Sequence, residues 1–427
     1  MANALDYVRW RGDLSFDASP VNEVDIFLFS QLSTPDYSGI VPPDCGQITL
    51  SEACGRYFAA HEDSSPSLGV LQSEYVIPML RLLPEYGRFA GVKLSRYVNR
   101  VITENVEQFS AVTIDLPGGA KCISFRGTDD TIIGWKEDCN LAVSESVPAQ
   151  KDALAYLISA AEGFRGELTV CGHSKGGNLA IYAAANAPEE IRKQLRAVYN
   201  FDGPGFNAEF LASEGYLAVK DRITTVLSQN SLVGILLTQV GTCRTVRSCK
   251  SGPIAHDGFT WEVLGREFVP AEGLSDSSRA IRKAMNETLA GMDCGEKQGF
   301  IDELFGILLS TGSETITELS KDIQASRLQS IAEAVRSLHA SKKVTSFMLK
   351  VAASVLGSAY EDNTARIFAA FEEATARLSS TVEENTAKIT AAGAELMSSV
   401  RSGIDSKIDS AKEELLLRYE KSHRSGK

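Results

Sequence analysis

The chain has 427 residues with a formal net charge of -12, and 44% of its residues are hydrophobic. This length and composition allow a sizeable core and indicate two or three domains, or one large domain with an appendage. The acidic balance argues against nucleic-acid binding, because phosphate contacts need clustered lysine and arginine. None of the cysteines forms a C-x-x-C pair, so we expect no zinc site. We also expect no other metal and no cofactor.

The N-terminal stretch, MANALDYVRWRGDLSF, is polar and charged and has no apolar signal core. No stretch of the sequence reaches the length that a membrane-spanning helix needs. We therefore expect a cytoplasmic protein.

Short apolar strands and intervening helices are predicted between residues 109 and 247. In chain order they are a hairpin of strands 109–115 and 121–125 around Pro117-Gly118-Gly119, a helix at about 149–162, a strand from 168, a helix to 187, and strands at 197–201, 223–227 and 243–247. Strands that alternate with helices imply a parallel sheet with helices on both faces. The predicted fold class is α/β, of the α/β-hydrolase type, with catalytic groups at the carboxyl ends of the strands.

The segment LTVCGHSKGGNL, residues 168–179, carries the strongest functional signal. An apolar strand enters a G-x-S-x-G turn centred on Ser174, and an alanine-rich helix follows. This strand–turn–helix context is the one that a nucleophile elbow needs. Glycines fit beside the serine because a Cβ would clash there. The helix that starts after Ser174 directs free backbone N–H groups to the space above its hydroxyl.

After about residue 300 the chain is rich in Ala, Ser, Glu, Lys and Leu, and no proline follows Pro270. We expect residues 1–300 to form the hydrolase domain and 301–427 an α-helical C-terminal appendage. Between 367 and 415 apolar residues recur about every 3.7 positions, which favours a coiled coil from about residue 361. A lone helix is the alternative, since the seam is thin. The run 344–356 could instead pack on the catalytic domain or lie in a membrane interface.

Acyl transfer by a serine needs a base, a group that orients the base, and donors for the oxyanion. His173 adjoins Ser174, and neighbours in a tight turn point apart, so we expect His173 to pack beside the sheet. His256 follows the last strand on a loop and comes after the nucleophile, as the order Ser, acid, His requires. We therefore expect His256 to be the base.

The acid is less strongly indicated. Asp202 ends the strand that follows the elbow, where a carboxylate points over the sheet edge, and we choose it as the acid. Its alternative role is an Asx turn that stabilises the Gly203-Pro204 bend. The next strand ends without a carboxylate, and Asn230 or Ser231 could orient His256 by a hydrogen bond instead.

The oxyanion hole needs two donors. The N–H of Lys175, directly after the nucleophile, should be one of them. Thr128, in FRGTD, should supply the other from its N–H or hydroxyl, because Gly127 lets the backbone approach the site. We expect the Lys175 side chain to face solvent, and residues 129–148 to form a lid.

The sequence resembles the class 3 (fungal-type) lipases in FRGTD, in Trp135 and Asp138 of WKED, and in GHSKGGNLA. The segments DYVRWRGDLSF, NEVDIFLFSQL, NFDGPGF, NSLVGILL and AHDGFTW look like a bacterial branch of α/β-hydrolase-like proteins. Together the resemblance covers about residues 5–265. It implies an oxyanion role for Thr128 and a nucleophilic role for Ser174. The lipases carry their acid after the strand that here ends at Asn230-Ser231, and that acid is missing.

The residues thus predict a serine hydrolase that cleaves a carboxylic ester, with a small ester or a lipid as substrate. The alternative is a catalytically inactive scaffold on the same fold, because fold alone does not establish activity. In either case the helical tail is a candidate for self-association or for contact with a membrane surface.

Overall fold

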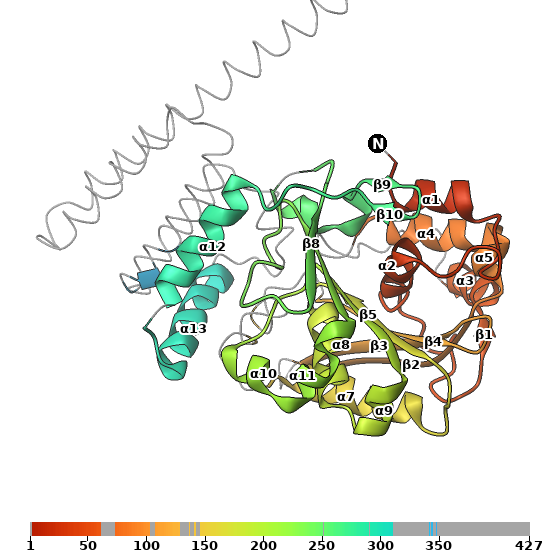
Figure 1. The fold of residues 1–427 in the computed structure, drawn as a ribbon, viewed down its shortest axis with the longest axis horizontal. Coiled ribbons are helices and arrows are strands. Elements are labelled where there is room, and N and C mark those ends of the chain that lie inside the picture. The colour runs from red at the N-terminus through yellow and green to blue at the C-terminus, as the bar shows by residue number, and fades with distance from the viewer. Residues whose placement is uncertain are drawn as a thin grey trace, which may run out of the picture. The chain divides into compact units, whose positions relative to one another are not determined.

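The computed structural model describes residues 2–60, 73–102, 107–128, 136, 141, 146–250, 252–289, 291–310, 341, 343, 344 and 347 (Figure 1). These residues all belong to one compact unit. The predicted coiled coil from about residue 361, and Trp135 and Asp138 of the family resemblance, lie outside them. No described helix combines the length and the apolar character that crossing a bilayer requires.

An eight-stranded sheet runs through this unit, and its strand order follows the chain. The strands are β1 (Ile48–Thr49), β2 (Lys93–Ile102), β3 (Glu107–Asp115), β4 (Lys121–Phe125), β5 (Leu168–His173), β6 (Leu195–Phe201), β7 (Ile223–Ser228) and β8 (Thr242–Val246). Pairing is antiparallel from β1 to β4 and parallel from β4 to β8. The predicted α/β class is confirmed, and the predicted hairpin is the β3–β4 pair.

Helices cover both faces of the sheet (Figure 1). The α-helices are α1 (Ala4–Arg11), α2 (Glu23–Gln31), α3 (Leu50–Ala60), α4 (Val76–Leu82), α5 (Gly87–Ala90), α7 (Pro148–Ala161), α8 (Lys175–Asn186), α9 (Glu189–Gln194), α10 (Ala208–Ala212), α11 (Glu214–Val219), α12 (Asp276–Leu289) and α13 (Cys294–Ser310). A short two-stranded sheet of β9 (Val263–Leu264) and β10 (Glu267–Phe268) follows the last strand of the main sheet.

Each face of the sheet has its own apolar core, because successive strand residues point to opposite sides. Cys122 and Cys171 belong to the core that contains α1 and α2. Ile123 and Val170, their neighbours along the strands, belong to the core that contains α7 and α8. The parallel strands are therefore buried on both sides, which agrees with their near-continuous apolar sequences.

A buried ion pair fixes α2 against the first face. The Arg88 guanidinium donates from Nε to Asp25 Oδ1 at 3.0 Å, and Tyr7 donates its hydroxyl to the same oxygen at 3.0 Å. Arg88 also donates to the Ser19 carbonyl at 2.8 Å. Since the charges are paired and hydrogen-bonded, they can be tolerated inside the core. The network holds α2 under β4 and β5, so that Phe27 reaches the end of β5.

Candidate active site

Ser174 stands between β5 and α8, at the carboxyl end of a parallel strand. Its backbone has φ 56° and ψ -134°, a conformation that non-glycine residues rarely adopt. The Ser174 N–H donates to the Phe201 carbonyl at 2.9 Å, and the Ser174 carbonyl accepts from the Gly177 N–H at 2.9 Å. These contacts hold the strained residue in place, and the strand–turn–helix predicted from the sequence is present.

Three glycines allow the start of α8 to pack closely against the sheet. A Cβ on Gly172 would overlap the Gly176 backbone, and one on Gly176 would overlap the Phe125 carbonyl. A Cβ on Gly177 would overlap the Asn200 side chain. The turn that presents Ser174 therefore requires glycine at three positions, because a Cβ would meet the backbone of α8, the backbone of β4 or the Asn200 side chain of β6.

We expect Gly172→Ala to lower the free energy of unfolding by about 3 kcal/mol or more, because the new methyl meets backbone that cannot rotate away. Urea unfolding measures the change. Gly55→Ala is the matched control, since Gly55 lies in α3 with open space around its Cα. That substitution should be neutral or stabilising by about 0.5–1 kcal/mol. Equal effects of the two substitutions would contradict the packing argument.

His256 and Asp202 form a buried pair. His256 Nδ1 lies 2.8 Å from Asp202 Oδ2, and the two side chains are 4% and 0% exposed. The other ring nitrogen, Nε2, is buried and makes no hydrogen bond with any described residue. A ring held at Nδ1 with its Nε2 unbonded has the form that a general base needs.

Asp202 directly follows β6 and adopts a positive φ of 53°. Its N–H donates to the Val226 carbonyl at 2.8 Å, and its Oδ1 accepts from the Ser228 N–H at 3.3 Å. Burial raises the pKa of this carboxyl, and its contact with His256 opposes the rise. The Gly203-Pro204 bend, considered as a role for an Asx turn of Asp202, is held instead by Asn200, whose Oδ1 accepts from the Gly203 N–H at 2.8 Å.

A second amide network supports the loop after Asp202. Asn178 on α8 donates to the carbonyls of Pro204 at 3.2 Å and Gly205 at 3.0 Å. Gln150 on α7 donates to the Asn178 side-chain oxygen at 2.8 Å. The helix that follows Ser174 thus also fixes the loop that follows Asp202.

The alternative orienting groups make other contacts. Asn230 donates its side-chain amide to the Lys250 carbonyl at 3.0 Å. Ser231 is fully buried, and the Oγ of Ser231 and the Oδ1 of Asp202 would both lie within 3 Å of a Cβ on Gly234. Asp202 is the group that contacts Nδ1 of His256. Sequence reasoning could choose Asp202 from its place at a strand end, but could not exclude the other two.

The loop of His256 is fixed on both sides of the histidine. Trp261 donates its Nε1–H to the Ala255 carbonyl at 2.9 Å. Asp257 accepts from the Ser73 hydroxyl at 2.6 Å and from the Phe259 N–H at 3.0 Å. Burial raises the pKa of Asp257 to about 6. The position of the His256 ring thus depends on a segment far away in the sequence.

The segment after β4 passes close to the elbow. A Cβ on Gly127 would lie 2.8 Å from the His173 carbonyl oxygen and 3.1 Å from the Ser174 Cβ. Thr128, the next residue, is 2% exposed. The backbone of 127–128 therefore runs beside Ser174, as an oxyanion loop would. Most of the predicted lid, residues 129–148, lies outside the described residues.

The expectation that the Lys175 side chain faces solvent is wrong. Lys175 is the first residue of α8, and its side chain is fully buried. The tight packing of the elbow against β4 and β6 encloses this position. Charge alone suggested an exposed residue, whereas the location in the turn determines its burial.

His173 makes a contact that the sequence did not reveal. It packs at the sheet as expected, edge-on to Phe27 with ring centroids 6.4 Å apart. Its Nε2 also lies 2.8 Å from the backbone carbonyl oxygen of His256, so Nε2 carries the proton and donates. The two imidazole rings lie 4.6 Å apart at 35°. The residue next to Ser174 therefore contacts the loop of His256 directly.

His173 should make the fold sensitive to acid. Burial and the charge of His256 lower the pKa of His173 to about 3. Since the unfolded pKa is about 6.5, the neutral ring stabilises the fold above pH 6.5, and this contribution is lost as the pH falls toward 3. Between pH 7 and pH 5 the loss is about 2 kcal/mol. Between pH 7 and pH 5 we expect the free energy of unfolding of His173→Phe to fall by about 2 kcal/mol less than that of the parent, as measured by urea unfolding.

The carboxyls of Asp257 and Asp202 cannot produce this difference in unfolding free energy between the parent and His173→Phe. Raised pKa values at Asp257 and Asp202 stabilise the fold as the pH falls, which is the opposite sign. Both carboxyls are present in the parent and in the variant, so their contributions cancel in the comparison. An equal change in unfolding free energy for the two proteins would contradict the prediction.

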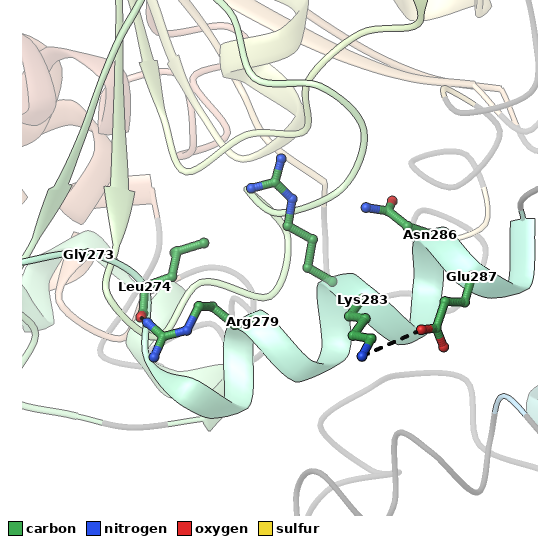
Figure 2. A pocket seen from close by; sticks show the side chains of 7 residues that line it. Gly273, Leu274, Arg279, Lys283, Asn286 and Glu287 are labelled. Carbon is green, nitrogen blue, oxygen red and sulfur yellow. Dashed lines mark hydrogen bonds and ion pairs between the residues drawn. The ribbon is translucent and has the colours of Figure 1, made fainter.

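A surface hollow of about 610 Å³ lies along α12, and none of the candidate site residues lines it (Figure 2). It is lined by Gly273, Leu274, Arg279, Arg282, Lys283, Asn286 and Glu287. Lys283 and Glu287 form an exposed ion pair there at 3.8 Å. In the described part of the chain, no three His, Cys, Asp or Glu side chains are grouped so that they could hold a metal ion.

Residues 83–306 match a family model described as Mbeg1-like. Curated proteins gave no match. Among solved structures, the chain is similar to the crystal structure of M37 lipase, with 16% sequence identity and a TM-score of 0.31. That similarity covers 50% of this chain and 68% of the lipase chain.

Proposed function

The chain belongs to the Mbeg1-like family, and we propose that it is a serine hydrolase that cleaves a carboxylic ester through an acyl-enzyme on Ser174. One observation carries the proposal. The buried His256–Asp202 pair, with Nε2 unbonded, lies at the strand edge that presents Ser174 in its strained turn. Membership of this lipase-like family is consistent with hydrolysis, and the finer resemblance to class 3 lipases stays a prediction.

Ser174 and His256 are connected through short contacts. The Ser174 N–H bonds to Phe201, the residue before Asp202, and Asp202 contacts His256. On the other side His173, the residue before Ser174, contacts His256. These two sets of contacts support a site in which the hydroxyl and the imidazole meet at one edge of the sheet.

In the proposed reaction, the Ser174 Oγ attacks the ester carbonyl carbon while His256 Nε2 takes its proton. Asp202 accepts the Nδ1–H of His256 and stabilises the imidazolium that forms. The negative charge on the carbonyl oxygen is held by the Lys175 N–H and by Thr128. His256 then gives its proton to the alcohol that leaves, and a water molecule cleaves the acyl-enzyme by the same steps.

A protein without turnover remains the alternative proposal. In the sequence, the absence of a carboxylate after the strand that ends near Asn230 favours this inactive scaffold. Asp202 contacts His256 from the neighbouring strand, so that absence no longer distinguishes the two functions. Self-association or membrane contact through the tail, and a cytoplasmic location, stay predictions.

Hydrolysis of p-nitrophenyl acetate and p-nitrophenyl octanoate separates the alternatives. We expect release of p-nitrophenol well above that of a Ser174→Ala background with at least one of the two esters. The preferred acyl length indicates whether the substrate is a small ester or a lipid. Rates equal to the background with both esters would favour the inactive scaffold.

A further inference from the structure

The ring of His173 is held in a nearly closed environment. It is 8% exposed, edge-on to Phe27, and 6.5 Å from Trp261 between ring centroids. Phe27 belongs to α2, and Trp261 follows the loop of His256. His173 therefore cannot swing away from its position without displacing the aromatic core beneath the site.

The contacts of His173 constrain His256 in two ways. The Nε2–H of His173 fixes the backbone of His256 through its carbonyl oxygen. The face of the His173 ring lies against the His256 ring, 4.6 Å away. Asp202 fixes only the Nδ1 end of His256, about which the ring could still tilt. A second contact surface is needed to set the direction of Nε2.

We infer that His173 is a positioning residue, which holds the His256 ring so that its Nε2 faces Ser174. The inference rests on the proposed function, because it assigns the elbow histidine a role in the same site. It also explains why the neighbour of the nucleophile bears an imidazole. A phenyl ring would keep the contact between the rings but would lose the hydrogen bond to the His256 carbonyl.

Burial keeps His173 neutral at working pH, with its pKa lowered to about 3. The titratable groups that contact or adjoin His256 besides His173 include Asp202 at the end of β6 and Asp257 in the same loop. Both are acids, and a neutral His173 adds no positive charge that would oppose protonation of His256 during turnover. The residue can thus support the base without competing with it for protons.

The test compares His173→Phe, which keeps the ring, with His173→Gln, which keeps an amide donor at similar reach. We expect His173→Phe to lower kcat for the preferred p-nitrophenyl ester by about tenfold with KM nearly unchanged, since one orienting hydrogen bond is lost. His173→Gln should recover part of kcat. Cys171→Ala is the matched control, because Cys171 is buried on the same strand and contacts Cys122 instead.

Proton NMR gives a readout that does not depend on catalysis. The full-length protein should show a low-field signal from the Nδ1–H of His256 bonded to Asp202, and His173→Phe should broaden or shift it. Cys171→Ala should leave the signal and kcat unchanged even if its melting temperature falls. If His173→Phe keeps both the signal and kcat of the parent, His173 only fills the core and the inference is wrong. If the parent hydrolyses no ester but the signal responds, the positioning contact stands and the proposed function fails.

Discussion

Replacing Ser174 by alanine should lower kcat for the preferred p-nitrophenyl ester by about a millionfold, to the background that binding and the oxyanion donors alone provide. The substitution removes the only atom that can form the acyl-enzyme in the proposed reaction, whereas the turn itself is held by backbone contacts. We therefore expect KM and the melting temperature to change little. Steady-state kinetics and thermal unfolding measure the two effects separately.

Ser231→Ala is the control for this prediction. Ser231 is also a buried serine at the same sheet edge, close to Asp202. Ser231 is not the nucleophile in the proposed reaction, so the kcat of Ser231→Ala should remain within about tenfold of the parent value. A Ser174→Ala protein that retains activity near that of the parent would show that the hydrolysis occurs elsewhere.

Replacing Asp202 by asparagine should lower kcat by about ten thousandfold, because it changes the tautomer of His256. The Ser228 N–H bonds to one carboxylate oxygen of Asp202, and His256 Nδ1 contacts the other. In the variant the carbonyl oxygen of the amide takes the Ser228 bond, and the NH2 group faces His256. Nδ1 then has to accept, so the proton moves to Nε2, which can no longer accept one from Ser174.

The same substitution should leave stability unchanged or raise it. Asp202 is a fully buried carboxyl whose pKa is raised by that burial, and the amide is isosteric and uncharged. Asn230→Ala, at the residue considered as an alternative orienting group, should keep kcat within a few fold. If Asn230→Ala lost more activity than Asp202→Asn, the assignment of the acid would be wrong.

The sequence was sufficient to predict strands β3 to β8 and helices α7 and α8, because their signals are local, but it did not predict helices α9 to α11 or strands β9 and β10. Glycine and proline mark the β3–β4 turn, and the apolar run before Ser174 is short and continuous. The sequence did not identify β1, β2 or the helices that precede them. In α2 every residue is buried, so no amphipathic period marks it as a helix. Its acid, Asp25, is buried only because Arg88, far along the chain, pairs with it.

In the candidate site, too, local sequence motifs could indicate single residues but not the contacts that tertiary packing forms between them. Ser174 could be proposed as the nucleophile from its motif, and Asp202 and His256 as its partners from their places relative to the strands. The contact of His173 with His256 could not be predicted, because it depends on how the loop that follows β8 packs against β5. The burial of Lys175 required the packing of the elbow against two strands. Neither the His173–His256 contact nor the burial of Lys175 can be read from the residues next to them in the sequence.

Reaction with a fluorophosphonate probe, followed by mass spectrometry of the labelled peptide, tests the central claim most directly. An activated serine hydroxyl displaces the fluoride and keeps the phosphonyl group, whereas an ordinary serine does not react. We predict one adduct, on Ser174, that is absent from Ser174→Ala and strongly slowed in Asp202→Asn. A protein that remains unlabelled, or that is labelled equally in the parent and in Ser174→Ala, would contradict the account.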